Sequence, residues 1–272
     1  MTSVAEALRQ AREQGLDRLD AQLMMANLLG CDRAWLISHD DATLTADQTS
    51  QLAQQVAQRA AGLPLAYLVG VKEFHGLTLR VTADTLVPRP ETELLVDWAL
   101  ERLSALPGTP RVVDLGTGSG AIALAIKHRH PAADVQAVDL STAALAVAEN
   151  NAQRLGLEVK FHQGEWWQPL VGERFALIVS NPPYIAGADP HLPALRHEPL
   201  TALTPGGDGL SALQAIIQGA PGHLQPGGWL LLEHGFDQAP PVASALRARG
   251  FVELALRHDL AGQPRASGGR WP

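Results

Sequence analysis

At 272 residues the chain is long enough for one large domain or two modest ones, and its 21 Lys and Arg against 28 Asp and Glu give a formal net charge of −7. Hydrophobic residues make up 46% and charged residues 18%, a balance that excludes a disordered chain. The single cysteine, Cys31, excludes a disulfide framework and a cysteine-based zinc site, and we expect a soluble, cytoplasmic protein.

The first 70 residues carry helix signals only. The segment 1–10 contains charged residues and lacks the apolar run of a secretory signal, so the helical pattern starts at once. Apolar residues then recur at helical spacing in four stretches, each opened by a capping residue. We therefore predict a small helical bundle over 1–70, with helix starts at Ser3, Asp17, Asp32 and Thr45 and stops at Gly15, Gly30 and Gly62.

The pattern changes at residue 71. Between Val71 and Pro88, apolar and polar residues alternate around Gly76, which favours a β-hairpin. We predict that this hairpin links the bundle to the rest of the chain.

From Glu91 onward, helix and strand signals alternate. Such alternation predicts an α/β fold with a mostly parallel sheet and helices on both faces. The tail from Arg265 to Trp271 is expected to add a last edge strand. The predicted helices are 91–105, 120–129, 142–155, 210–219 and 238–249, and the predicted strands are 111–115, 134–139, 158–163, 175–180, 228–233 and 251–256.

One stretch within this region, 209–232, has no Asp, Glu, Lys or Arg. It contains Pro221, Pro226 and several glycines, so it cannot form a continuous apolar helix. We therefore predict no membrane span here.

The strand 111–115 runs directly into a glycine-rich turn. Residues Asp114 and Leu115 are followed by Gly116, Thr117, Gly118, Ser119 and Gly120, which open a helix. Glycines let the backbone pass close to a ligand and leave amide groups free at the helix N-terminus. The pattern indicates a nucleotide-type ligand, although Gly116, Gly118 and Ala121 also satisfy the dinucleotide fingerprint.

Two acidic residues bear on the choice between a dinucleotide and a nucleotide-type cofactor that carries a positive charge. Asp114 lies at the end of its strand, where a carboxylate suits a cationic ligand better than a pyrophosphate. Asp139 ends the next strand and can accept hydrogen bonds from ribose hydroxyls, which suits either cofactor. S-adenosylmethionine, whose sulfonium is positively charged, is therefore preferred to NAD, and a glycine turn with no ligand is the remaining alternative.

The strand 175–180 ends in a second motif, Asn181-Pro182-Pro183-Tyr184. Ligands of open α/β sheets bind at the carboxyl ends of the strands, so this loop should lie beside the glycine turn. The Asn181 and Pro182 carbonyls can accept the two hydrogens of one –NH2 group, the prolines stiffen the loop, and Tyr184 offers a flat face. The motif predicts a receptor for a planar amine or amide nitrogen, with a simple Asn-Pro turn as the alternative.

These two motifs together resemble class I methyltransferases that act on planar nitrogens, a group that includes adenine-N6 DNA methyltransferases and protein-glutamine N5-methyltransferases. Further segments resemble the release factor glutamine methyltransferase family, and the resemblance extends over nearly the whole chain. They are the segment 87–93 (V-P-R-P-E-T-E), Pro64–Tyr67, Lys72–Phe74, Glu198-Pro199 and Gly206–Leu210. The occurrence of the segment 87–93 together with Asn181–Tyr184 is highly specific.

The resemblance implies an enzyme that methylates the side-chain amide of the glutamine in the Gly-Gly-Gln motif of class 1 peptide chain release factors. It implies S-adenosylmethionine as cofactor, held by Asp114, the loop Gly116–Gly120, Asp139, Trp166 and Asn181. It implies substrate binding by Asn181, Pro182, Pro183 and Tyr184, with catalytic roles for Asn181, Pro182 and Tyr184. Glu165 departs from the more common aspartate of the family, which puts the adenine contacts in doubt.

The domain expectation follows from the same segments. Residues 1–70 would recognise the substrate, 71–88 would form the hairpin linker, and 89–272 would form the methyltransferase domain. No metal is expected, since His128 and His130 are two residues apart on a helix and point in different directions. His197, His234 and Glu198 are interpreted as structural residues, and no catalytic base is assigned.

Two alternative enzyme functions differ from this one in the substrate, and a third alternative is not an enzyme. Adenine methylation would need a basic face, whereas residues 1–70 hold five Arg against eight Asp and Glu. Glutamine methylation of a ribosomal protein would share the Asn181–Tyr184 loop, and a catalytically silent adaptor for a translation factor would not need it. We therefore expect release factors as partners, with no direct nucleic-acid or membrane contact, and a monomer.

Overall fold

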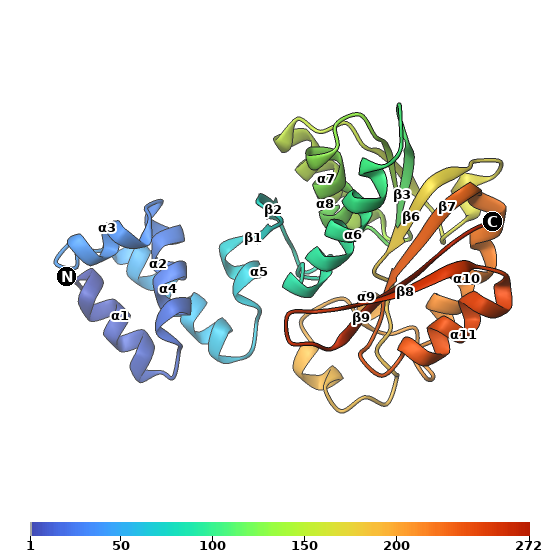
Figure 1. The fold of residues 1–272 in the computed structure, drawn as a ribbon. Helices are drawn as coiled ribbons and strands as arrows, with labels where there is room; N and C mark the ends of the chain where they lie inside the picture. The colour runs from blue at the N-terminus through green and yellow to red at the C-terminus, as the bar shows by residue number, and fades with distance from the viewer. Residues whose placement is uncertain (1) are drawn as a thin grey trace. The chain divides into compact units, whose positions relative to one another are not determined.

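The computed structural model describes residues 2–272. The chain forms two compact units, Met1–Val71 and Lys72–Pro272, which are described separately. Figure 1 shows the ribbon of each unit, from the N-terminal helices in blue to the C-terminal strands in red.

The described residues up to Gly70 form helices, as predicted, with one isolated β-bridge between Ser3 and Thr43. Ser3, Asp17 and Asp32 each accept a backbone N–H through the side chain at the predicted helix starts. Thr45 and Gln48 form a complete capping box. A short fifth helix after Pro64 was not predicted. The helices are α1 (Val4–Glu13), α2 (Arg18–Leu29), α3 (Arg33–Ser38), α4 (Ala46–Ala60) and α5 (Leu65–Val69).

This unit has a hydrophobic core of its own. Val4, Met24 and Met25 are fully buried, and they pack with Leu36 and Val56 from two further helices. Burial of such side chains stabilises a fold by about 1.5–3 kcal/mol each. The helices are therefore held together by packing within the unit.

The predicted hairpin is shorter than 71–88. Its strands are β1 (Val71–Phe74) and β2 (Leu77–Arg80), and the residues from 81 to 89 form no regular element. The Asn151 side chain accepts a hydrogen bond from the Arg80 N–H at 2.7 Å and donates to the Arg80 carbonyl at 2.9 Å. The same amide donates to the Ser119 carbonyl at 3.0 Å, so one buried side chain joins the hairpin to the glycine loop.

A seven-stranded sheet forms the centre of the second unit. Its strand order is β5-β4-β3-β6-β7-β9-β8, and the first five strands in this order are parallel. The predicted α/β fold with a mostly parallel sheet is therefore confirmed. The strands are β3 (Arg111–Leu115), β4 (Asp134–Asp139), β5 (Lys160–Gln163), β6 (Phe175–Ser180), β7 (Leu224–Glu233), β8 (Val252–His258) and β9 (Pro264–Arg270).

The predicted edge position of the C-terminal strand is wrong. β9 lies between β7 and β8 and pairs antiparallel with both, so β8 is the edge. Gly268 explains why this segment fits inside the sheet, because a Cβ there would come within 2.6 Å of Leu231 and 2.8 Å of the Trp98 ring. Glycine weakens a strand signal in the sequence, but in β9 the lack of a side chain at Gly268 leaves room for the Trp98 ring.

Helices cover both faces of the sheet. Helices α6, α7 and α8 pack on one face, and α10 and α11 pack on the other. Neighbouring strand residues alternate between the faces, so Val112 belongs to the first core and Val113 to the second. The helices are α6 (Glu93–Ser104), α7 (Ala121–Arg129), α8 (Thr142–Leu155), α9 (Leu200–Leu203), α10 (Ser211–His223) and α11 (Ala239–Arg249), with single-turn helices η1 (Pro90–Thr92), η2 (Gln168–Leu170) and η3 (Leu192–Leu195).

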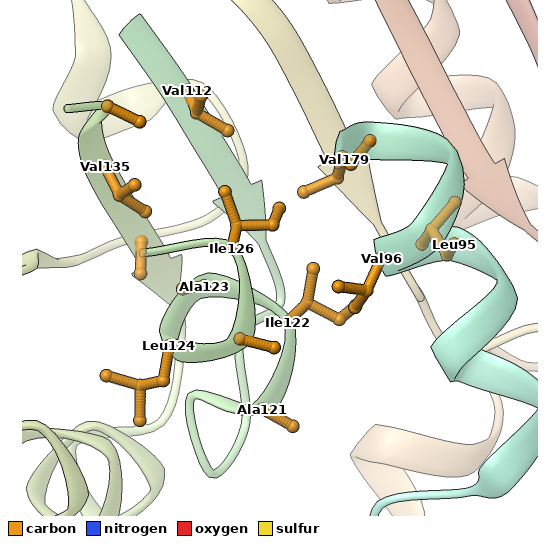
Figure 2. Close-up of a cluster of buried hydrophobic side chains, with 14 of the residues drawn as sticks. Leu95, Val96, Val112, Ala121, Ile122, Ala123, Leu124, Ile126, Val135 and Val179 are labelled. Atoms are coloured by element: carbon orange, nitrogen blue, oxygen red, sulfur yellow. The ribbon is translucent and has the colours of Figure 1, made fainter. Parts of the chain in front are cut away.

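Figure 2 shows how the first core holds α7 against the sheet. Ile126 points toward Val112 of β3, and Ile122 lies beside Val96 of α6 in the cluster that also contains Val179 of β6. All of them are at most 5% exposed. Because α7 begins directly after the glycine loop, this packing fixes where the loop ends.

No helix in residues 2–272 is long and apolar enough to cross a membrane. The charge-free stretch 209–232 forms α10 and most of β7 instead of one continuous helix.

Candidate functional site

Four loops leave the same edge of the sheet in a row. The registers pair Leu115 with Val138 and with Ser180, and Ser180 with Leu232. Because these strands are parallel, the segments that follow β4, β3, β6 and β7 lie side by side. The Ser180 hydroxyl also donates to the Leu115 carbonyl at 2.6 Å, which ties together the two central strand ends. The predicted neighbourhood of the glycine loop and the Asn181 loop is confirmed.

The glycine loop has the backbone that its sequence predicts. Gly116, Gly118 and Gly120 all have positive φ, of 75°, 56° and 84°. A Cβ on Gly118 would meet nothing within 4 Å, so this side of the loop is open. Residues with positive φ and no side chain let a ligand approach the backbone closely.

Asp114 lies directly beneath this loop. Its Oδ2 accepts hydrogen bonds from the Thr117 hydroxyl at 2.6 Å and from the Ala123 N–H at 3.3 Å. Burial raises its pKa to about 7, and Oδ1 has no hydrogen-bond partner among the described residues. An unpaired buried acceptor is costly, so Asp114 fits a site where a positively charged ligand group supplies the missing partner.

Asp139 closes the loop from the neighbouring strand. Its Oδ2 accepts the Gly118 N–H at 2.8 Å and its Oδ1 accepts the Ser141 N–H at 2.9 Å. Burial raises the pKa of Asp139 above its ordinary value. Each carboxylate oxygen keeps a second lone pair that can accept a ligand hydroxyl.

Trp166 brings an aromatic ring to the same loop. A Cβ on Gly116 would lie 3.4 Å from the Trp166 ring, so the ring packs directly against the glycine. Trp166 itself has a φ of 45°, a left-handed conformation that is uncommon for a bulky residue. The strained backbone turns the ring toward the loop, where it can contact a flat ligand group.

The Asn181 loop is held from several sides. Asn181 Nδ2 donates to the Thr92 hydroxyl at 3.1 Å, and this leaves its carbonyl oxygen as the acceptor available to a ligand. The Tyr184 carbonyl accepts a hydrogen bond from the Gln238 side chain at 2.9 Å. Pro182 is buried, and the peptide bonds of the loop are trans. These contacts hold the loop in place from several elements.

Gly209 provides the closest packing against this loop. A Cβ at this position would lie 2.2 Å from the Tyr184 carbonyl oxygen, and its φ is +82°. Only glycine fits here without moving the loop. The segment around Gly209 was part of the family resemblance, and this close contact with Tyr184 is a physical reason for a glycine there.

Sequence reasoning missed two residues of the site, Thr92 and Glu233. Thr92 is buried and contacts Asn181 as described. Glu233 ends β7, and its Oε1 accepts a hydrogen bond from the Tyr184 hydroxyl at 3.3 Å. Burial is the main cause that raises the pKa of Glu233 to about 7. The sequence signal that could have identified Glu233 is a carboxyl directly after the apolar run Trp229–Leu232.

Glu198 connects the segment before η1 to the site. It is buried, accepts the Val87 N–H at 3.1 Å and pairs with Arg89 at 2.5 Å. The structure therefore gives Glu198 a structural role, as interpreted from the sequence. Loss of Arg89 would leave the buried Glu198 carboxylate without its charged partner, which is destabilising.

His234 also has structural contacts. Its Nε2 is 2.7 Å from the Ser267 hydroxyl and its Nδ1 is 2.8 Å from the Gly235 carbonyl. Burial lowers its pKa, which disfavours the charged form. In residues 2–272 no group of three or more His, Cys, Asp or Glu side chains could hold a metal ion.

The buried carboxyl of Asp114 makes stability depend on pH. Its raised pKa, about 7, means that folding favours the protonated form, so its contribution is complete below about pH 4 and is lost as the pH rises through 7. Relative to Asp114→Asn, the free energy of unfolding of the unmodified chain should therefore fall by up to about 1.4 kcal/mol per pH unit in this window. Urea unfolding of both proteins at pH 5, 6, 7 and 8 measures the difference in the free energy of unfolding. A difference that does not depend on pH would contradict the raised pKa of Asp114.

Comparison with known proteins gives two family matches. Residues 92–234 match the family described as methyltransferase small domain, and residues 1–70 match the PrmC N-terminal domain. Each compact unit therefore contains one of the two matches.

Individual relatives match over nearly the whole length. The chain is 51% identical to a release factor glutamine methyltransferase of Xylella fastidiosa strain Temecula1 over 269 residues, which cover 98% of each chain. It is 50% identical over 260 residues to a protein of the same name from Bordetella pertussis, covering 94% of this chain and 96% of the relative. A crystal structure of a methyltransferase from Pyrococcus furiosus matches 83% of this chain and 98% of its own with a TM-score of 0.54 at 17% identity, which bears on the fold alone.

Proposed function

The chain belongs to the release factor glutamine methyltransferase family, and we propose that its Asn181–Tyr184 loop holds the glutamine side chain that the enzyme methylates. The enzyme uses S-adenosylmethionine to methylate a release factor, at the glutamine of the Gly-Gly-Gln motif of class 1 factors. The observation that carries the proposal is the free carbonyl oxygen of Asn181, held beside the glycine loop by the contact of Asn181 Nδ2 with Thr92.

The residues around the glycine loop fit the cofactor. S-adenosylmethionine supplies an electrophilic methyl group on a positively charged sulfur. Gly118 leaves the backbone open, Asp139 can accept the ribose hydroxyls, and Trp166 can contact the adenine. Asp114 would place a buried carboxylate near the positive charge of the cofactor, with Thr117, Ser119 and Gly120 completing the loop.

The Asn181 loop would compensate for a weak nucleophile. An amide nitrogen has its lone pair delocalised into the carbonyl, so it attacks poorly. The carbonyls of Asn181 and Pro182 would accept its two hydrogens, and Pro183 and Tyr184 would confine the flat amide. Correct placement of two reactants is worth about 7–11 kcal/mol. No side chain is assigned as a strong base, and the proton can leave to solvent.

The Asp139 carboxylate should matter most for cofactor affinity. Asp139→Ala removes a charged acceptor from the ribose hydroxyls and should weaken S-adenosylmethionine binding by about 1.5–3 kcal/mol. Isothermal titration calorimetry measures this, with Glu158→Gln, a change at an exposed position, as the control. An unchanged Kd, or tight binding of NAD, would contradict the proposed cofactor contacts.

The N-terminal helical unit would recognise the protein substrate, since none of its residues belongs to the proposed cofactor or amide sites. A chain that starts at Lys72 keeps the whole second compact unit and its core, and it should still bind S-adenosylmethionine. It should lose most of its activity on intact release factor, because a single loop contact buries little surface and a second contact raises its effective concentration. Methylation of intact release factor as fast as by the full chain would show that the unit is not a recognition domain.

The competing substrates can be separated in one assay. Purified chain with labelled S-adenosylmethionine is offered a class 1 release factor, DNA and ribosomal proteins in parallel. Label should enter the release factor only. Label in DNA would favour adenine methylation, label in a ribosomal protein would favour the related enzyme, and no label in any of them would favour an adaptor.

A further inference from the structure

Two side chains of one segment hold Tyr184 at opposite ends. The Tyr184 hydroxyl donates to Glu233 Oε1 at 3.3 Å, and the Tyr184 carbonyl accepts a hydrogen bond from Gln238 Nε2 at 2.9 Å. Glu233 is the last residue of β7 and Gln238 directly precedes α11, so both belong to the segment 233–238. Because β6 and β7 are parallel neighbours, this segment leaves the sheet next to the Asn181–Tyr184 loop.

The segment 233–238 is itself held in place. Glu233 pairs with Ala266 of β9 in the sheet. At the other end, the Gln238 N–H donates to the Gly235 carbonyl at 2.9 Å, and the Gly235 N–H donates to Gln238 Oε1 at 2.9 Å. Since Oε1 is the acceptor for Gly235, the Gln238 amide turns its Nε2 donor toward Tyr184. The segment therefore presents one acceptor and one donor in fixed directions.

We propose that Glu233 and Gln238 are positioning residues that hold Tyr184, so that its ring confines the flat amide of the substrate glutamine. This inference rests on the proposed function of the Asn181–Tyr184 loop. The hydroxyl lies on the long axis of the ring, so its bond to Glu233 fixes the direction in which the ring points, while packing against the second core limits the rotation of the ring. The bond from Gln238 fixes the backbone at the other end of the residue.

The burial of Glu233 supports a role beyond packing. The residue is 1% exposed, and its Oε2 has no hydrogen-bond partner among the described residues. A buried acceptor without a partner is destabilising, and an apolar residue after the run Trp229–Leu232 would avoid that cost. Arg265, whose charge favours the ionised form of Glu233, forms its ion pair with Asp259 at 3.2 Å, so a partner for this arginine is already present.

The contact between Tyr184 and Glu233 does not depend on a titration near neutrality. Burial raises the pKa of the Tyr184 hydroxyl far above its ordinary value, so the hydroxyl keeps its proton and can donate. A carboxyl group retains an acceptor oxygen whether it is ionised or protonated. The hydrogen bond from Tyr184 to Glu233 can therefore form on both sides of neutral pH.

The hold on Tyr184 can be observed without release factor or cofactor, because the sequence contains only two tyrosines, Tyr67 and Tyr184. The full chain is labelled with tyrosine carrying 13C at the Cζ atom, which bears the hydroxyl, and the Tyr184 signal is identified by its loss in Tyr184→Phe. Glu233→Met removes the acceptor at similar side-chain length and should shift the Tyr184 signal, while the Tyr67 signal stays in place. Glu233→Gln keeps an acceptor oxygen, so its Tyr184 signal should lie nearer to that of the unmodified chain.

A rate measurement tests the consequence for methyl transfer. Glu233→Met should lower kcat/KM for a release factor by about tenfold, the effect of one lost hydrogen bond, with the Kd for S-adenosylmethionine unchanged. Glu233→Gln should restore most of the rate. Gln136→Met is the matched control, because Gln136 is a buried glutamine of β4 whose side chain contacts His162 at 2.9 Å, and it should change neither the rate nor the Tyr184 signal.

Double variants separate the two ends of Tyr184. Glu233 acts through the hydroxyl, so Glu233→Met should cause no further loss of rate in Tyr184→Phe, which has no hydroxyl. Gln238 acts on the backbone carbonyl, which Tyr184→Phe keeps. Gln238→Met should therefore lower the rate by the same factor, again about tenfold, in both backgrounds.

The outcomes separate the inference from the proposed function. A Tyr184 signal that does not move in Glu233→Met would overturn the inference, as would equal losses of rate from Glu233→Met with and without the Tyr184 hydroxyl, or an unchanged rate in Gln238→Met. Glu233→Leu carries the same tests if Glu233→Met does not fold. A Tyr184 signal that behaves as expected in a chain that methylates no release factor would support the hold on Tyr184 and contradict the proposed function.

Discussion

Asn181→Ala should abolish most methyl transfer while the protein stays folded. The substitution removes the carbonyl that would accept one hydrogen of the substrate –NH2 group, and the nitrogen would no longer be held in line with the methyl group. Loss of one preorganised hydrogen-bonding partner in an active site costs about 10²–10³ in rate. Single-turnover methylation of a release factor at saturating cofactor measures the loss directly.

A folding control is needed because Asn181 also contacts buried Thr92. The thermal midpoint and the binding of S-adenosylmethionine should change little in comparison with the rate. A rate within tenfold of the unmodified enzyme, in a variant that folds, would contradict the proposed role of the Asn181–Tyr184 loop.

Gly209→Ala should have an effect of similar size from outside the loop. The new Cβ would lie 2.2 Å from the Tyr184 carbonyl oxygen, far inside van der Waals contact, so we expect the Tyr184 backbone and the segment around Gly209 to move apart. Misplacement of catalytic groups by about 1 Å can cost about 10² in rate. We expect a loss of that order, with S-adenosylmethionine binding largely retained because the glycine loop lies on another strand.

Gly207→Ala provides the matched control. Gly207 also has a positive φ, of +57°, but a Cβ there would meet nothing within 4 Å. It should therefore cost stability, by about 1 kcal/mol, without displacing the loop. Equal rates for Gly207→Ala and Gly209→Ala would show that the contact with Tyr184 does not position the site.

The strands of the sheet could be predicted closely because burial dictates their sequence. β3, β4 and β6 have the predicted bounds, since strands buried on both faces are rich in apolar residues and here end at polar or glycine residues. The same abrupt ends marked Gly116 and Asn181 as site residues. Local sequence therefore carries both the sheet and the loops that leave it.

Features that depend on tertiary contacts could not be predicted. The inner position of β9 depends on Gly268 passing beneath Trp98, two residues far apart in the sequence. The contacts of Thr92 and Glu233 with the Asn181 loop likewise join three segments that the sheet brings together. No periodicity records such contacts, so sequence reasoning found the loop and missed what holds it.

The position of the transferred methyl group shows whether the chain methylates the glutamine side-chain amide. A class 1 release factor is incubated with the full chain and S-adenosylmethionine, digested, and its peptides are sequenced by mass spectrometry. We expect one added methyl group, on the side-chain amide of the glutamine in the Gly-Gly-Gln peptide, and far less of it after the same short incubation with Asn181→Ala. A methyl group on any other residue, or an unmodified Gly-Gly-Gln peptide after complete incubation, would contradict it.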